Sequence, residues 1–75
     1  MSVEGVVARI FSLDPSEVTD QSSKETIMAW DSMGHLLLIT GLEEEFKVSL
    51  AIVDAMEMTS VGKIKTMLRQ YGVAL

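Results

Sequence analysis

The sequence contains no cysteine and only one proline. Without cysteine, the chain can form neither a disulfide framework, nor a thiolate metal site, nor a thiol nucleophile. Scarce proline together with 48% hydrophobic residues argues against disorder. Basic residues are also few: six Lys and Arg against eleven Asp and Glu give a net charge of −5. This balance argues against nucleic-acid binding, which needs clustered positive charge.

Long hydrophobic runs are missing as well. The run from Leu36 to Ile39 is far too short to span a membrane, and the first residues do not resemble a secretory leader. We therefore expect a cytoplasmic protein without a membrane span. A length of 75 residues predicts a single domain over residues 1–75, near the lower size limit for folding without disulfides or a structural metal ion.

The apolar residues that are present recur at helical spacing. A first group predicts a helix over residues 3–12, and similar patterns predict helices over residues 32–46, 51–56 and 60–71. No alternating pattern is long enough to predict a sheet. The expected fold class is all-α, a four-helix bundle of three longer helices and a short third helix.

Local signals mark the segments between these helices. Residues 14–17, Asp-Pro-Ser-Glu, resemble a capping box and predict one short turn with Val18 beneath it. Thr59 is expected to cap the last helix and Gly72 to end it.

A long polar loop is expected over residues 19–30, between the first and second helices. Its apolar members are expected to pin it to the core. They are Ile27, Met28 and Trp30. Loops of this length in compact domains usually have a function.

Ser32 lies where the loop meets the second predicted helix, directly after Asp31. Backbone N–H groups and the helix dipole favour a phosphate at such a position. No base for the hydroxyl is evident. We therefore interpret Ser32 as a point of attachment.

The second predicted helix has two distinct faces. Its core stripe is expected to contain Leu38, Ile39, Leu42 and Phe46. The opposite face should meet water and contains Met33, Leu37, Thr40 and Glu44. Two large apolar side chains near Ser32, Met33 and Leu37, form a candidate contact patch.

Two other kinds of functional site, a catalytic triad and a metal site, are disfavoured. Asp31, Ser32 and His35 contain the residue types of a catalytic triad, but His35 is expected to project toward the core, away from Ser32. A metal site at residues 43–45, Glu-Glu-Glu, is disfavoured because consecutive helical positions point in different directions; Glu43 is expected to pair with Lys47 instead.

Three segments in a fixed order resemble the acyl carrier protein family and its peptidyl-carrier relatives. They are Trp-Asp-Ser-Met-Gly-His-Leu at residues 30–36, Leu-Glu-Glu-Glu-Phe at 42–46 and Met-Thr-Ser-Val at 58–61. The resemblance implies a 4′-phosphopantetheine arm on Ser32, between Asp31 and Met33. A dedicated transferase with magnesium would transfer it from coenzyme A, and the arm's thiol would carry acyl groups as thioesters.

The resemblance also implies the protein's wider role. It would be a carrier, not an enzyme, serving a phosphopantetheinyl transferase and acyl-transferring, synthase or ligase enzymes. The acidic balance of the chain and the absence of a predicted sheet favour a monomer. An interior chamber between the second and third helices would shelter the acyl chain, with His35 at its mouth. Its candidate lining is Leu38, Leu42, Phe46, Met58 and Met67.

The sequence departs from the family at the expected partner surface. Met33 replaces the leucine after the serine, and Gly34 and Leu37 stand where fatty-acid-synthesis carriers have acidic residues. The third helix is apolar at Ile52, Val53 and Met56, where those carriers are strongly acidic. We therefore expect hydrophobic partner recognition through Met33, Leu37, Ile52 and Val53, with Glu44 available to a basic partner.

These departures favour a specialised carrier of a lipid or secondary-metabolite pathway, such as fatty acid or polyketide biosynthesis. Two alternatives stay open from the sequence. One is a peptidyl or aminoacyl carrier, and the other is a helical adaptor that binds a partner without a prosthetic group.

Overall fold

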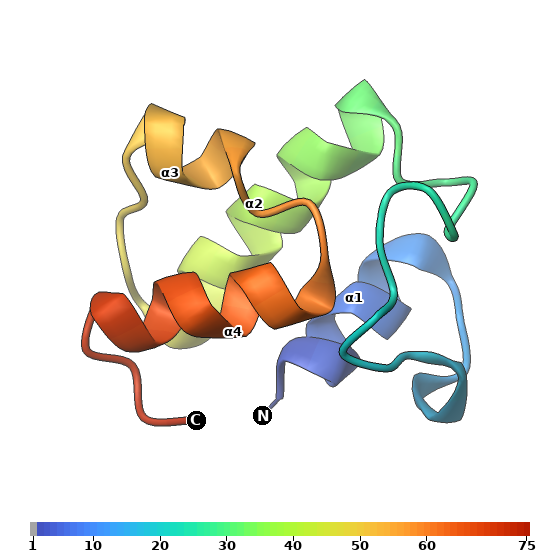
Figure 1. Ribbon diagram of the computed structural model, residues 1–75, viewed down its shortest axis with the longest axis horizontal. Helices are drawn as coiled ribbons and strands as arrows, with labels where there is room; N and C mark the ends of the chain where they lie inside the picture. The colour runs from blue at the N-terminus through green and yellow to red at the C-terminus, as the bar shows by residue number, and fades with distance from the viewer. Residues whose placement is uncertain (1) are drawn as a thin grey trace.

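Residues 2–75 fold into four α-helices and one short 3-10 turn (Figure 1). The computed structural model describes residues 2–75, and these contain no β-strand. The elements are α1 (Val3–Phe11), η1 (Pro15–Glu17), α2 (Ser32–Phe46), α3 (Ile52–Met56) and α4 (Val61–Gln70). The prediction of an all-α bundle with a short third helix is therefore confirmed.

Side-chain caps fix where three of the α-helices begin. The Ser2 hydroxyl accepts a hydrogen bond from the Gly5 N–H at the start of α1, and Asp31 caps α2. Ser60 caps α4 by accepting from the Lys63 N–H. The prediction that Thr59 is this cap was wrong by one residue, because only Ser60 places its oxygen over the first turn. Helix α3 begins without a side-chain cap.

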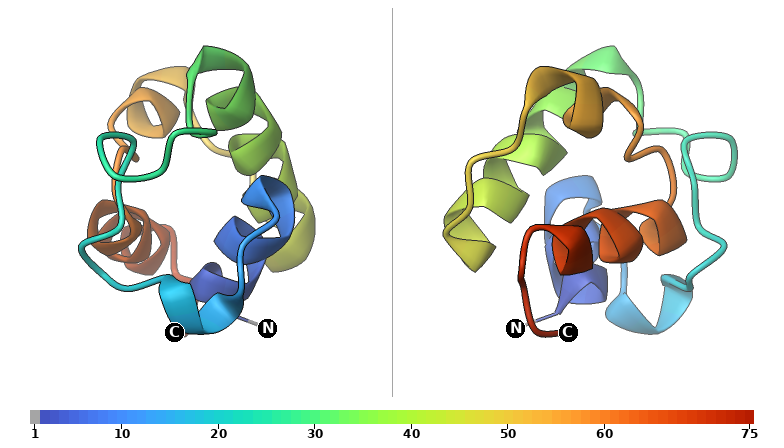
Figure 2. Two further views of the ribbon diagram at one scale, coloured as in Figure 1. Left: turned by 90° about the vertical axis from the view of Figure 1, so that its right-hand side faces the viewer. Right: turned by 60° about the vertical axis from the view of Figure 1, so that its left-hand side comes forward.

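The core lies between α1, α2 and α4, which surround it in the two views of Figure 2. Helix α1 packs against both α2 and α4. The buried apolar residues of the three helices are Val3, Val6, Val7, Ala8, Phe11, Leu38, Leu42, Val61, Ile64 and Leu68. Met58, from the connection between α3 and α4, is fully buried with them.

The predicted capping box is confirmed. Asp14 accepts from the Ser16 N–H, and the Glu17 carboxylate accepts from the Asp14 N–H. These bonds hold η1, and Val18 follows it into the core.

The loop over residues 19–30 is attached to the core and to α4. Trp30 is buried, and its ring stacks on Phe11 with centroids 5.5 Å apart. Ile27 packs on the core as predicted, but Met28 is 97% exposed, so the prediction that Met28 pins the loop was wrong. A turn in the loop directs this side chain into solvent.

Backbone hydrogen bonds join the same loop to the start of α4. The Lys24 N–H donates to the Thr59 carbonyl, and the Val61 N–H donates to the Ser22 carbonyl. This pairing brings Lys24 and Thr59, which are far apart in the sequence, to one side of the molecule.

Candidate functional site

Ser32 is the first residue of α2, and its side chain is exposed. The preceding Asp31 caps the helix: its Oδ1 accepts from the Gly34 N–H at 2.8 Å, and its carbonyl accepts from the His35 N–H at 2.7 Å. The Ser32 hydroxyl makes no hydrogen bond to any of residues 2–75. It is therefore a free hydroxyl at the electropositive end of a helix of 15 residues.

Gly34 lets the chain approach this helix start closely. A Cβ atom added at Gly34 would lie 2.3 Å from the Ala29 carbonyl oxygen and 2.9 Å from a ring carbon of Phe11. Only glycine fits, so the loop end can fold back tightly against the first turn of α2. This contact fixes the orientation of the Ser32 segment.

A cleft of about 400 Å³ lies beside Ser32. It is formed by the long loop, the first turns of α2 and the connection after α3. The lining residues are Lys24, Trp30, Asp31, Ser32, His35, Met56 and Thr59. No local pattern indicates that Lys24, Met56 and Thr59 belong to this site, because long-range packing of the loop brings them together.

His35 is held by hydrogen bonds at both ring nitrogens. The Trp30 indole N–H donates to Nδ1 at 3.0 Å, and Nε2 lies 2.8 Å from the Ala55 carbonyl oxygen. Because an indole N–H can only donate and a carbonyl can only accept, Nδ1 is the acceptor and Nε2 carries the proton. His35 therefore ties α3 to the start of α2. Neither ring nitrogen of His35 is directed at Ser32. This agrees with the expectation that the His35 side chain points away from Ser32.

The predicted partner-contact residues lie on the surface of α2 and α3. Met33 and Leu37 of α2 are 67% and 55% exposed, and Ile52 and Val53 of α3 are 79% and 69% exposed. Glu44 is exposed on α2. Leu36 and Met56 are exposed as well, at 64% and 68%, although neither is among the predicted partner-contact residues.

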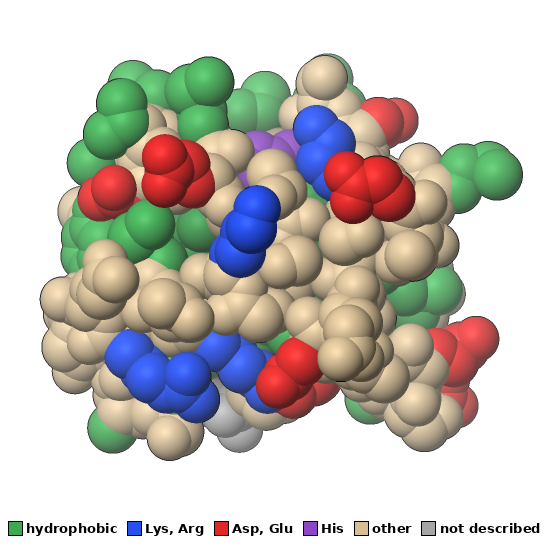
Figure 3. Space-filling model, viewed as in Figure 1, with side chains coloured by type: hydrophobic (Ala, Val, Ile, Leu, Met, Phe, Trp, Pro, Cys, Tyr) green, Lys and Arg blue, Asp and Glu red, His purple; other side chains and the backbone are tan. Residues whose placement is uncertain are grey.

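These six apolar residues, which we call the α2–α3 apolar face, are Met33, Leu36, Leu37, Ile52, Val53 and Met56. Figure 3 shows hydrophobic side chains gathered at the upper left of the molecule, over α3. Exposed apolar side chains that gather in this way usually mark a contact surface.

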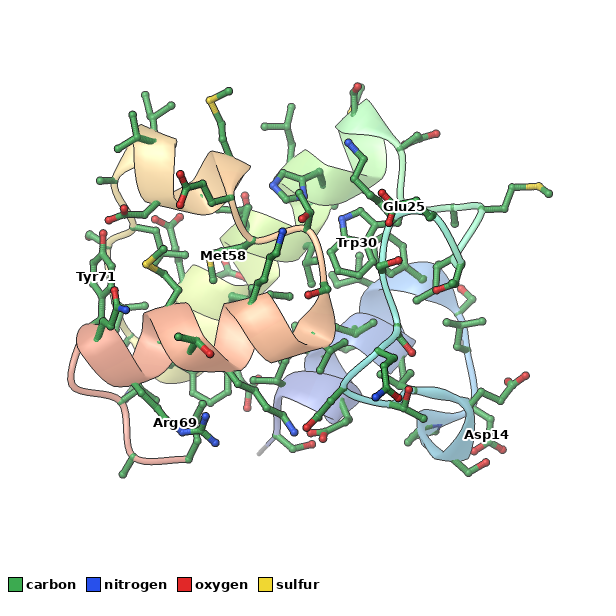
Figure 4. All side chains as sticks on the ribbon, viewed as in Figure 1. Asp14, Glu25, Trp30, Met58, Arg69 and Tyr71 are labelled. Atoms are coloured by element: carbon green, nitrogen blue, oxygen red, sulfur yellow. The ribbon has the colours of Figure 1, made fainter. Side chains whose placement is uncertain are left out.

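The predicted chamber residues lie in or against the packed core. Leu38, Leu42 and Met58 have no exposed surface, while Phe46 and Met67 are partly buried against the core. Figure 4 shows Met58 between α3 and α4. The predicted Glu43–Lys47 pair was wrong: the Glu43 carboxylate accepts from the Leu50 N–H at 2.9 Å and anchors the α2–α3 connection.

Comparisons with known proteins address the fold and the family. No model of a known protein family matches the chain. Among solved structures, a protein from Mycobacterium tuberculosis that is assigned as an acyl carrier protein has a TM-score of 0.80 and 26% sequence identity, over 92% of both chains. This chain is an acyl-carrier-like domain. A holo acyl carrier protein from Geobacter metallireducens is similar over 91% of this chain and 78% of its own, with a TM-score of 0.79 and 26% identity.

Two further observations on this acyl-carrier-like domain concern a membrane span and a metal site. Residues 2–75 contain no helix long and apolar enough to cross a membrane. In the same part of the chain, no three side chains of His, Cys, Asp or Glu gather where they could hold a metal ion.

Proposed function

We propose that the domain is an acyl carrier protein whose Ser32 hydroxyl bears 4′-phosphopantetheine. The observation that carries this proposal is the free, exposed hydroxyl at the start of α2, beside an open cleft. The similarity to a holo acyl carrier protein supports it.

The residues around Ser32 suit a phosphodiester. The N-terminus of α2 favours negative charge, and Lys24 lines the same cleft with a cation. Asp31 is acidic, but its Oδ1 is occupied by the Gly34 N–H. A phosphate on Ser32 would therefore meet the helix end and one lysine.

Attachment of the arm would be a phosphoryl transfer from coenzyme A to Ser32. The Ser32 Oγ forms a bond to the β-phosphorus of coenzyme A, the pyrophosphate P–O bond breaks, and adenosine 3′,5′-bisphosphate leaves. The transferase, with magnesium, supplies the base that takes the hydroxyl proton. The bound arm supplies a thiol that carries acyl groups as thioesters, which this cysteine-free chain cannot do by itself.

The domain's own contribution is presentation rather than catalysis. Both nitrogens of His35 are engaged by Trp30 and Ala55, so His35 is not placed to take a proton from Ser32. This geometry disfavours a serine hydrolase and supports a carrier that is not itself an enzyme.

The α2–α3 apolar face is the proposed contact surface for the transferase and for the acyl-transferring, synthase or ligase enzymes of the pathway. It adjoins Ser32 through Met33, and Glu44 offers a negative charge further along α2. An apolar rather than acidic face fits a specialised pathway. The acidic balance of the chain favours a monomer, and we place the domain in the cytoplasm. The cargo is an acyl group, with an aminoacyl group as the alternative.

The test is the intact mass after incubation with coenzyme A and a phosphopantetheinyl transferase. The wild type should gain the mass of one arm, and Ser32→Ala should gain none. Ser49→Ala, at another exposed serine, is the matched control and should be modified like the wild type. An equal gain in Ser32→Ala would remove the proposal.

The exposed apolar face also favours a second candidate, a helical adaptor without a prosthetic group. An adaptor requires that Leu37→Glu abolish capture of its partner while Ser32→Ala leaves capture intact. A carrier requires Ser32 for every productive encounter.

A further inference from the structure

A second hollow lies along α4, next to the cleft beside Ser32. It has a volume of about 840 Å³, and Met56 and Thr59 line both hollows. We refer to the two adjoining hollows together as the groove, whose lining residues extend from Ser32, past the end of α3, to Gln70 near the end of α4. Figure 1 shows α3 above α4 on the face toward the viewer. Ten residues of helix give the α4 part a length of about 15 Å.

The far part of this groove, along α4, is lined by polar as well as apolar side chains. Thr59, Ser60 and Thr66 contribute hydroxyl groups and Gln70 an amide, with Met56 and Met67 as the apolar members. The attached arm contains two amides and one hydroxyl group, and burying these without hydrogen-bond partners costs free energy. The hydroxyl and amide side chains of the groove offer such partners, whereas Leu38 and Leu42 in the closed interior do not.

Lys63 adds a cation to the groove. Its Nζ lies 3.4 Å from the Thr59 hydroxyl, and no carboxylate oxygen of residues 2–75 lies within 4.0 Å of it. Glu57 contributes a carboxylate to the same hollow without forming an ion pair with Lys63. Lys63 can therefore donate to an oxygen atom of a bound group, such as a thioester carbonyl or a hydroxyl.

We infer that the groove along α4 is a binding site for the arm and for a short polar acyl group that accepts hydrogen bonds. This inference rests on the proposed function, since it needs an arm on Ser32. In this arrangement the arm's amides lie against the hydroxyl groups of Thr59 and Thr66. The acyl group lies beside Lys63 and Gln70, outside the packed core. The domain then selects short oxygenated cargo over long apolar chains.

The test compares two loaded forms of the full chain by NMR. A phosphopantetheinyl transferase loads the isotope-labelled chain from 3-hydroxybutyryl-coenzyme A or from octanoyl-coenzyme A, and mass spectrometry confirms each product. With the hydroxyacyl group, we expect amide shift changes at Thr59, Lys63 and Thr66, and nuclear Overhauser contacts from these residues to the pantetheine. The methyl groups of Leu38 and Leu42 should keep their shifts.

Two exposed positions on α4 provide a matched pair of variants. Thr66→Phe fills the groove and should remove the pantetheine contacts and the shift changes at Thr59 and Lys63. Arg69→Phe adds the same ring away from the groove, where Arg69 lines a separate hollow near Glu4, and should leave them intact.

Three outcomes would overturn the inference. They are shift changes confined to the first turn of α2, equal contacts in Thr66→Phe and wild type, or insertion of the hydroxyacyl group among the Leu38 and Leu42 methyl groups. Failure of the proposed function is distinguishable, because in that case no form of the chain gains the mass of the arm.

Discussion

At the scale of single residues, the start of α2 depends on an absent side chain. Gly34 lies under the Ala29 carbonyl and the Phe11 ring, and Asp31 caps its N–H. In the sequence alone, Gly34 is evident only as a departure from the acidic residues of fatty-acid-synthesis carriers. Its steric role depends on how the loop returns to the helix, which no local pattern encodes.

Gly34→Ala should therefore destabilise the fold, although alanine is the better helix former. Overpacking of this kind costs about 1–3 kcal/mol. Urea unfolding should show the loss as a lower midpoint. Gly5→Ala is the control, since its added methyl would meet only the Ser2 hydroxyl at 3.1 Å. Equal stability of the Gly34→Ala variant and the wild type would contradict the steric argument.

A second residue-scale effect concerns Lys65, which bridges two carboxylates. Its Nζ lies 2.6 Å from Glu4 and 2.7 Å from Asp20. The hydrogen bond from Lys65 lowers the pKa of Glu4 below its ordinary 4.5. The hydrogen bonds to Asp20 and then Glu4 raise the pKa of Lys65 above 10.5. This cluster joins α1, the long loop and α4.

The cluster should stabilise the fold at pH values between the lowered pKa of Glu4 and the raised pKa of Lys65. A lowered Glu4 pKa contributes stability that is present above pH 4.5 and is lost as the pH falls through the lowered value. A raised Lys65 pKa contributes stability that is lost as the pH rises through the raised value. Glu4→Gln should cost about 0.2–1 kcal/mol at neutral pH. The difference in unfolding free energy between this variant and the wild type should disappear as the pH falls through the lowered pKa of Glu4. A difference that stays constant down to pH 2 would contradict the contribution of this ion pair.

At the scale of elements, α3 is the least anchored helix. It has five residues, no side-chain cap and no buried residue. Two side chains hold it: His35 through the Ala55 carbonyl, and Tyr71, whose hydroxyl donates to Asp54 and accepts from the Ala51 N–H. Figure 4 shows Tyr71 rising from the end of α4 toward α3.

Tyr71→Phe should loosen α3 and leave the other helices intact. Amide hydrogen exchange should become several-fold faster in residues 51–56, with little change in α1. The hydrogen bond to Asp54 raises the pKa of Tyr71 above its ordinary 10.0. The attachment is therefore present below pH 10.0 and is lost as the pH rises through the raised value, so wild type should come to resemble the variant in alkali. Unchanged exchange in residues 51–56 would contradict this attachment.

The boundaries of the elements show what sequence periodicity can and cannot supply. The predicted span of residues 32–46 matches α2, because its apolar stripe and Asp31 cap are local signals. Met28 was misplaced because apolar character alone does not reveal which way a loop turns. The Ser32 position was predictable from the motif, but the cleft beside it was not, since Lys24 and Thr59 meet through long-range backbone pairing.

At the scale of the whole molecule, a net charge of −5 coexists with the exposed α2–α3 apolar face. A partner that docks on this face must therefore present apolar side chains.

Met33→Glu should impair docking without unfolding the domain, because Met33 is 67% exposed. With the phosphopantetheinyl transferase as the partner, we expect kcat/KM for modification to fall about tenfold, as for loss of one interface anchor. Thr40→Glu, on the outward side of α2 but further from Ser32, should leave the rate near that of wild type. Equal effects of the two changes would indicate a general effect of charge.

The cleft beside Ser32 also has a consequence for the order of events in the cell. Its walls come from residues 24–35 and from residues 56–59, and the loop reaches its place by pairing with the start of α4. During synthesis, the serine emerges well before the second wall exists. We therefore expect modification to wait until residues 56–59 have emerged and the loop has paired with the start of α4. Stalled nascent chains that expose Ser32 but end before residue 56 should stay unmodified under conditions that modify the finished protein.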